Sequence, residues 1–171
     1  KRIEHLPWVD TASVHLYLPN KVEIVIKERT PVALWQRNGR LSLIDTTGRV
    51  IAGAKIDKFG NLPILLGEEA PRRAALLFDL LSAAGPLSSG VIGANWVGKR
   101  RWNLKLTNGV IIKLPEDSPD RALRRLSRLD KRFRLLERDI KTIDLRLPDK
   151  MIIKLGTQRA LSNQQGAGRR T

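Results

Sequence analysis

Seven residues, Gly93-Ala-Asn-Trp-Val-Gly98-Lys99, have the spacing of a phosphate-binding loop. In such a loop the backbone N–H groups cradle phosphates, a Ser or Thr follows the lysine to hold magnesium, and a helix comes next. Here Arg100 follows the lysine, and residues 102–106 alternate as a strand does. The segment therefore predicts a strand with a glycine bulge, and no nucleotide site.

Other residues that could carry out chemistry are also poorly placed for it. Asp45-Thr-Thr-Gly48 has one residue more than the aspartic-protease triplet, so it predicts a hairpin turn. His5 and His15 have no carboxylate at an offset that would complete a metal pair. There is no cysteine and no serine in the nucleophile motif of hydrolases. We therefore expect no catalytic residue, no metal, no cofactor and no enzymatic activity.

A basic segment is the main candidate for a binding surface. The chain has 171 residues, with 32 basic and 17 acidic side chains and a net charge of +15. Eight of the basic residues lie between positions 121 and 138. They are compatible with nucleic-acid phosphates, with anionic lipid head groups, or with a solvated helix face. The segment lacks aromatic side chains that would stack on bases, since Phe133 falls on its apolar face.

Two hydrophobic periodicities predict the elements that carry these residues. Helices are expected from Pro71 to Gly85, largely buried, and after the N-cap Ser118, with Pro119 in its first turn. The second helix has an apolar face running from Ala122 through Phe133 to Ile140. Strands are expected at 13–18, 22–28, 32–35, 41–44, 50–52, 91–97, 102–106, 110–114, 143–147 and 151–155. This order predicts an α+β fold with a mostly antiparallel sheet and two helices.

Period-2 alternation also assigns faces within individual strands. Trp102, Leu104 and Leu106 are expected to share a core face. In 143–147, Ile143, Leu145 and Leu147 would share one face, and Asp144 and Arg146 the other. The strand at 151–155 is expected at a sheet edge, paired on one side with 143–147. Residues 156–171 have little to bury and predict a disordered tail.

A set of short motifs, taken in order, resembles the extracytoplasmic part of the FtsQ/DivIB bacterial cell-division proteins, in its alphaproteobacterial form. The motifs are Leu6-Pro-Trp-Val9, Ala12-Ser-Val14, Leu18-Pro19, Val22-Glu-Ile-Val-Ile26, Glu28-Arg-Thr-Pro-Val-Ala-Leu-Trp35, Leu43-Ile-Asp-Thr-Thr-Gly-Arg-Val50, Leu62-Pro-Ile-Leu-Leu-Gly67, Arg101-Trp-Asn-Leu-Lys-Leu-Thr-Asn-Gly109 and Ile143-Asp-Leu-Arg146. The resemblance covers nearly all of residues 3–155.

The resemblance implies a domain organisation and a location. Residues 1–29 would be the C-terminal half of a POTRA domain, 30–155 an FtsQ-type β-domain and 156–171 the tail. The protein would be the periplasmic part of a single-pass inner-membrane protein at the division septum. It would be a scaffold without catalytic activity that recruits the FtsB–FtsL pair and links early and late division proteins. Nucleic-acid binding through residues 121–138 stays as the alternative.

The resemblance also implies a binding site. In the family, a segment of FtsB adds as a strand to the last strand of the β-domain, which here is 151–155. Arg146 matches a family arginine that pairs with an FtsB carboxylate, and Arg100 is a looser match to a second one. Leu147 and Leu155 stand where the family has Tyr and Trp. The implied contacts are Arg100, Arg146, Leu147, Met151, Ile152, Ile153, Lys154 and Leu155.

Overall fold

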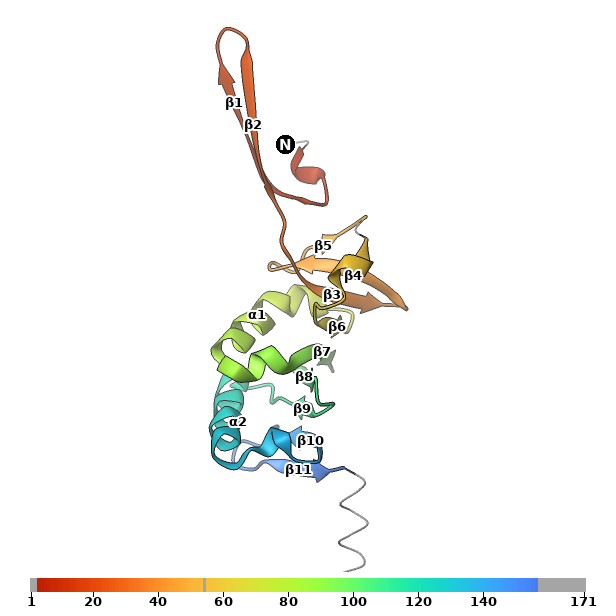
Figure 1. The fold of residues 1–171 in the computed structure, drawn as a ribbon, viewed down its shortest axis with the longest axis vertical. Coiled ribbons are helices and arrows are strands. Elements are labelled where there is room, and N and C mark those ends of the chain that lie inside the picture. Colours follow the sequence, from red (N-terminus) through yellow and green to blue (C-terminus); the bar gives the residue numbers. More distant parts are fainter. Residues whose placement is uncertain (1–2, 54, 157–171) are drawn as a thin grey trace, which may run out of the picture. The chain divides into compact units, whose positions relative to one another are not determined.

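The computed structural model of the protein describes residues 3–53 and 55–156 (Figure 1). The chain divides into two compact units, at Ala75 and Leu76. Helix α1 (Ala70–Ala83) contains this boundary. The tail expected at 156–171 lies outside the described residues, apart from Gly156. Within the described ranges, no helix combines the length and apolar character needed to cross a membrane.

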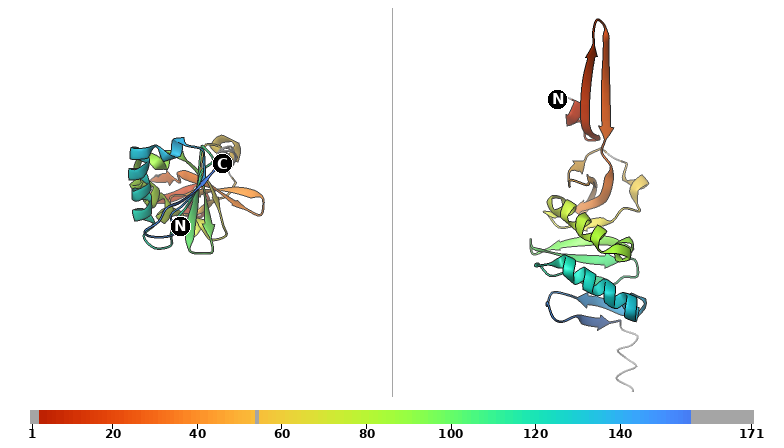
Figure 2. Two further views of the ribbon diagram at one scale, coloured as in Figure 1. Left: turned by 90° about the horizontal axis from the view of Figure 1, so that it is seen from below. Right: turned by 90° about the vertical axis from the view of Figure 1, so that its left-hand side faces the viewer.

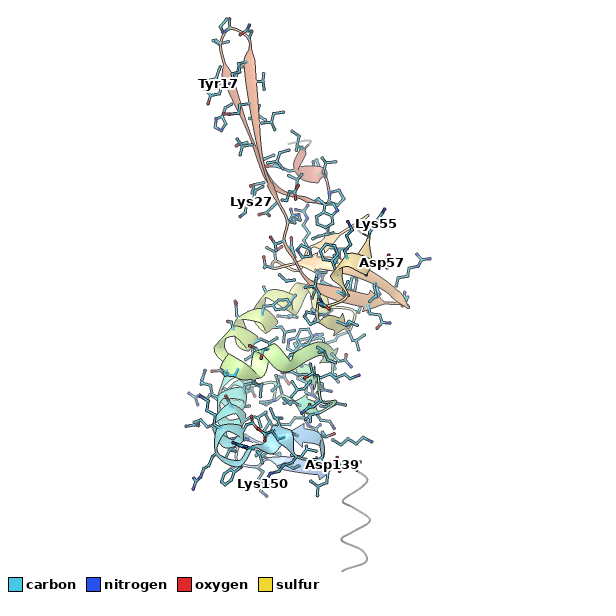
Figure 3. The ribbon with its side chains drawn as sticks, in the orientation of Figure 1. Tyr17, Lys27, Lys55, Asp57, Asp139 and Lys150 are labelled. Atoms are coloured by element: carbon cyan, nitrogen blue, oxygen red, sulfur yellow. The ribbon has the colours of Figure 1, made fainter. Side chains whose placement is uncertain are left out.

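The first unit begins with a long hairpin. Strands β1 (Val9–Tyr17) and β2 (Lys21–Glu28) pair antiparallel around the predicted turn. Side chains project from both of its faces, as Figure 3 shows near Tyr17 and Lys27. Most of them are exposed, including the apolar residues of the alternating pattern. The alternation therefore defines an apolar face that the described residues leave largely uncovered.

The rest of the first unit is a small mixed sheet. Its strand order is β6 (Ile64–Leu66), β3 (Pro31–Arg37), β4 (Arg40–Asp45) and β5 (Val50–Ile51). β3, β4 and β5 pair antiparallel in succession, whereas β6 returns to pair parallel with β3. The core of this unit is formed by Leu34, Leu43 and Ile51, against which Trp8, Leu41, Ile56, Phe59 and Leu62 pack.

A buried ion pair joins the end of the hairpin to this sheet. Arg29 Nη1 donates to Asp45 Oδ2 at 2.6 Å and to Asp10 Oδ1 at 3.3 Å. Asp45 Oδ1 accepts from the Thr47 amide, the Thr47 hydroxyl and the Arg49 amide. Burial by itself raises the pKa of Asp45, but these hydrogen bonds outweigh it and hold the pKa below its ordinary value. The predicted turn after Asp45 is confirmed, with the carboxylate as its organising group.

Helix α1 ends as predicted but is less buried than its composition suggested. Gly85 has φ +64, which glycine adopts without steric cost, and the short 3-10 helix η3 (Gly85–Gly90) follows. Ala74, Leu77 and Leu81 are buried on one face. Leu76 is 60% exposed, so the expectation of a largely buried helix is wrong on that side.

The second unit is a five-stranded mixed sheet. Its strands are arranged in the order β11 (Ile152–Leu155), β10 (Ile140–Asp144), β9 (Ile111–Lys113), β8 (Arg101–Leu106) and β7 (Val91–Val97). The pair β9–β10 is parallel and the other pairs are antiparallel. Trp102, Leu104 and Leu106 are all buried, which confirms the predicted core face. The fold is therefore α+β with mixed, mostly antiparallel pairing.

Helix α2 (Pro119–Phe133) connects β9 to β10 and lies along one side of these strands (Figure 2). Ala122, Leu123 and Leu126 are buried. The predicted apolar face does not continue as helix to Ile140, because Arg134 adopts φ +48 and ends α2. Phe133, at that end, is 44% exposed. Ser118 occupies the N-cap position as predicted, but its side chain makes no capping hydrogen bond.

Candidate partner-binding site

The end of β10 determines where the predicted site residues lie. β10 runs from Ile140 to Asp144, so the expected strand at 143–147 is misplaced. Ile143 and Leu145 are buried, but Leu147 is 49% exposed and does not share their face. Beyond Leu145, whose N–H still donates to the Lys113 carbonyl oxygen, the guanidinium of Arg125, on α2, donates to carbonyls of the following turn. The acceptors are the oxygens of Leu147, Pro148 and Lys150.

Arg146 folds back onto Asp144. Its Nε lies 2.8 Å from Asp144 Oδ1 and its Nη2 lies 2.6 Å from Oδ2, while its backbone N–H donates to Oδ1. The hydrogen bond from Arg146, stronger than the effect of burial, lowers the pKa of Asp144. The same pair raises the pKa of Arg146. The Arg146 side chain is still 42% exposed, so the pair lies at the surface with its guanidinium accessible.

β11 forms the outermost strand of this sheet. Its one neighbour among the described strands is β10, as the sequence predicted, with Asp144 opposite Ile152 and Ile143 opposite Ile153. The Gly156 N–H donates to the Asp139 carbonyl oxygen, so it points toward β10 and away from the open edge. Because backbone groups alternate in direction along a strand, the N–H and C=O groups of Ile153 and Leu155 point to the open edge. These groups are a template for a further strand.

The side chains of β11 project to two faces of the sheet. Met151, Ile153 and Leu155 alternate with Ile152 and Lys154. Ile153 is half-buried beside Ile143 on the face that α2 covers, whereas Ile152 and Lys154 are exposed on the other face. An added strand would therefore meet apolar side chains on the covered face and Ile152 with Lys154 on the open one.

Arg100 and Arg146 lie at the same end of the sheet. Arg100 comes just before β8, and Arg146 just after β10. Asn103 of β8 pairs with Lys113 of β9, and Lys113 pairs with Asp144 of β10. Two strand spacings separate β8 from β10, a distance of about 10 Å. Arg100 Nε is 3.7 Å from Glu116 Oε2, and both side chains are more than half exposed. The register therefore places both predicted arginines at one end of one sheet.

The open face of the sheet also carries Asn95, Asn103 and Lys113, polar residues that sequence reasoning did not assign to a site. One cross-strand row consists of Asn95, Asn103, Lys113, Asp144 and Ile152. Asn103 Oδ1 is buried and has no hydrogen-bond partner in the described part of the chain. The period-2 alternation in each strand predicts which face these residues take. It does not predict that they line up, because the register across five strands is set by tertiary pairing.

The segment with phosphate-loop spacing has no such loop geometry. Gly93 lies within β7, next to a register irregularity at Val91, and Lys99 lies in a turn with φ +58. Strand β8 follows this turn directly, as the sequence predicted. Among residues 3–53 and 55–156, no three acidic, histidine or cysteine side chains come together as metal ligands would.

Comparisons with known proteins identify the family. Residues 33–146 match the family model "Cell division protein FtsQ/DivIB, C-terminal", and residues 1–29 match "POTRA domain, FtsQ-type". The chain belongs to the FtsQ/DivIB family. This confirms the resemblance inferred from the short motifs, and membership of the family supports a role in cell division.

Curated FtsQ relatives are similar over most of the chain. The cell division protein FtsQ of Rhizobium meliloti (strain 1021) is 41% identical over 153 residues, which are 90% of this chain and 50% of the relative. That of Rhizobium radiobacter is 36% identical over 167 residues, covering 98% and 79%. That of Caulobacter vibrioides (strain NA1000 / CB15N) is 35% identical over 153 residues, covering 90% and 51%. The chain thus spans about half the length of the first and third of these relatives.

Proposed function

We propose that this FtsQ-family chain is a divisome scaffold that binds the FtsB–FtsL pair by strand addition to β11. The observation that carries the proposal is the position of β11 at the sheet edge, with the backbone groups of Ile153 and Leu155 directed outward. Strand addition obtains affinity from main-chain hydrogen bonds and specificity from alternate side chains. Met151, Leu155 and Leu147 supply apolar contact beside this edge.

The two arginines extend the proposed site toward acidic residues of the partner. Arg146 precedes the turn that leads into β11, and Arg100 lies at the same end of the sheet. Asp144 already holds the Arg146 guanidinium by Nε and Nη2, so an incoming carboxylate approaches its remaining Nη1 donor or displaces Asp144. In this role Asp144 keeps the guanidinium oriented before the partner arrives.

The proposed setting follows from family membership. We place the chain in the periplasm, as part of a protein anchored in the inner membrane, acting at the septum without catalysing a reaction. Residues 1–29 would complete a POTRA-type domain that meets other divisome proteins, and residues 30–155 would be the β-domain. The uncovered apolar face of the β1–β2 hairpin supports the first assignment, because sheets normally cover such a face.

A proline substitution tests strand addition. Ile153→Pro removes an N–H that points to the open edge, and proline is tolerated at such positions because no ladder bond is lost. Ile153→Ala is the matched control, because it loses the same side chain and keeps the N–H. Affinity for a purified FtsB–FtsL complex from the same bacterium should fall at least about tenfold further in the proline variant than in the alanine variant.

Both variants are first compared by thermal unfolding and by circular dichroism, so that a lost fold is not mistaken for a lost contact. Equal affinities of the two variants, with the fold intact in both, would contradict strand addition at this edge.

A second substitution tests the arginine. Arg146→Gln should weaken binding of FtsB–FtsL by roughly tenfold or more, since removing one member of an interfacial charge pair costs about 2–5 kcal/mol. Its surface pair with Asp144 contributes only about 0–1 kcal/mol to folding, so thermal stability should stay near that of the original chain. Arg40→Gln, at an exposed arginine of the first unit, is the control. A loss of stability parallel to the loss of binding would make Arg146 a structural residue.

A further inference from the structure

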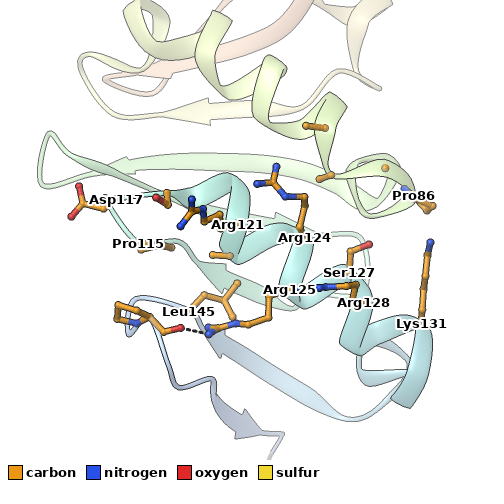
Figure 4. A pocket seen from close by; sticks show the side chains of 16 residues that line it. Pro86, Pro115, Asp117, Arg121, Arg124, Arg125, Ser127, Arg128, Lys131 and Leu145 are labelled. Atoms are coloured by element: carbon orange, nitrogen blue, oxygen red, sulfur yellow. Dashed lines mark hydrogen bonds between the residues drawn. The ribbon is translucent and has the colours of Figure 1, made fainter.

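A groove lies along α2, and Leu145 and Pro148, in the segment between β10 and β11, form part of its lining. Its volume is about 770 Å³, and Figure 4 shows the side chains that line it. Its apolar lining includes Ala84, Ala122 and Leu145, which are buried. Its basic lining consists of Arg121, Arg124, Arg125, Arg128 and Lys131. Asp117 is the acidic residue that lines it. The surface therefore combines a small-residue floor with a strongly positive rim.

Most of the positive charge on this rim has no acidic partner within residues 3–53 and 55–156. Arg124 pairs with Asp120, one turn earlier. The side chains of Arg121, Arg128 and Lys131 form no ion pair or hydrogen bond with any residue that the structure describes. Like charges at these helical spacings repel one another, which destabilises an isolated helix by a few tenths of a kcal/mol for each pair.

One of the basic groups is held in place. The guanidinium of Arg125 donates to the carbonyl oxygens of Leu147, Pro148 and Lys150, and the Pro148 bond is drawn in Figure 4. Its Nε atom is buried and lacks a hydrogen-bond partner in the described part of the chain. A freely solvated arginine has no such restraint. Arg125 therefore adds a fixed positive charge at the wall of the groove.

We propose that this groove binds an acidic segment of a partner protein, in addition to the partner that adds to β11. Charge complementarity selects the occupant, because a positive rim around an apolar floor fits carboxylates that flank small apolar side chains. Arg121 and Arg128 are seven residues apart, which is about 10.5 Å along the helix axis. Two turns of an acidic helix, with carboxylates at i, i+3 or i+4, and i+7, match that spacing.

Two other anionic partners fit the groove less well. Single-stranded nucleic acid binds to basic grooves that also carry aromatic side chains for stacking, and none of the residues that line this groove is aromatic. A lipid surface is flat, so it would contact the rim and leave the recessed apolar floor unfilled. An acidic protein segment uses both the charges and the recess.

Direct binding measurements on the whole chain test the proposal. The probe is a fluorescent, end-capped helical peptide of about 20 residues with Glu at the matching spacing and Leu and Ala between. A second peptide has Gln in place of each Glu. A short single-stranded DNA and vesicles of phosphatidylglycerol with phosphatidylcholine probe the other two classes. The test variant is Arg121→Glu with Arg128→Glu.

The control variant is Arg40→Glu with Lys58→Glu, which changes the net charge equally at exposed positions of the first unit. The Glu peptide should bind the original chain and the control alike, and bind the test variant at least about tenfold more weakly. The Gln peptide should bind poorly to all three proteins. Thermal unfolding checks the fold, and Arg121→Gln with Arg128→Gln replaces the test variant if charge reversal lowers stability.

Three results would overturn the proposal. Equal weakening in the control would mean that net charge alone attracts the peptide. Equal binding of the Gln and Glu peptides would mean that the groove does not recognise carboxylates. Binding of the DNA or the vesicles through Arg121 and Arg128, with no binding of the Glu peptide, would assign the groove to a different class of partner. The β11 variants should leave peptide binding unchanged, which keeps this outcome separate from that of strand addition.

Discussion

The buried pair between Arg29 and Asp45 makes a strong prediction about stability. Both side chains are only 5% exposed, and Asp45 accepts hydrogen bonds from Thr47 and Arg49 as well as from Arg29. Arg29→Met keeps an unbranched side chain and removes the charged guanidinium, leaving the Asp45 carboxylate buried without this cation. Breaking a buried pair in this way costs about 3–5 kcal/mol. For a chain of this size the midpoint of thermal unfolding should fall by roughly 6–20 °C.

Chemical and thermal unfolding of matched variants measures this cost. Arg37→Met is the control, because the pair between Arg37 and Glu68 has a distance of 3.3 Å but is exposed, with expected loss of about 0–1 kcal/mol. Arg29→Met combined with Asp45→Asn should be less destabilised than the sum of the single variants, by about 1–3 kcal/mol. If Arg29→Met costs no more than Arg37→Met, the pair does not hold the hairpin to the sheet and the reasoning fails.

The same pair predicts a dependence of stability on pH. The folded pKa of Asp45 lies below 3.8, the ordinary value for an Asp side chain. A carboxyl whose pKa is lowered by folding stabilises the fold above the unfolded pKa, and this contribution disappears as pH falls through the folded pKa. The original chain should therefore lose stability below about pH 4, and Asp45→Asn should lose less over that interval. Parallel pH profiles for the two proteins would contradict this assignment.

Two further substitutions have clear expected outcomes. Gly48→Ala would place its Cβ 1.8 Å from the Pro71 carbonyl oxygen, whereas the Cβ of Gly39→Ala would meet open space at a similar positive φ. In urea unfolding, Gly39→Ala should cost roughly 1–2 kcal/mol and Gly48→Ala much more. Leu104→Ala, in the core, should lower the free energy of unfolding by about 2–5 kcal/mol. Leu76→Ala, on the exposed side of α1, should lower it by less than about 0.5 kcal/mol. Similar losses for the two variants would refute the packing described for β8.

Local patterns in the sequence were sufficient to predict most of the helices and strands. The hairpin around Pro19, the strand with Trp102 and Leu104, and the helix that starts at Pro119 follow from periodicity, turn residues and proline position. These features depend on interactions between residues that are close in the chain, so a single sequence contains them. The edge position of residues 152–155 was also predictable, because the strand closes the pattern of hairpins.

The site itself depended on contacts between distant segments. The turn after β10 accepts hydrogen bonds from Arg125, more than twenty residues earlier, and the strand ends at Asp144 instead of Leu147. The predicted side assignment of Leu147 failed because periodicity cannot show where a ladder stops. Arg146 was expected to be available to a partner, and only the structure shows that Asp144 orients it.

Pairing between strands far apart in the chain was likewise decided by the tertiary structure. β9 and β10 are parallel because α2 crosses between them, and this register brings Arg100 to the same end of the sheet as Arg146. The ion pair between Arg29 and Asp45 likewise depends on tertiary structure, because it joins the end of the hairpin to the end of β4. Alternation along a strand identifies faces, but it contains no information on which strand lies beside which. That choice follows from the burial of whole faces against one another, which is a property of the assembled chain.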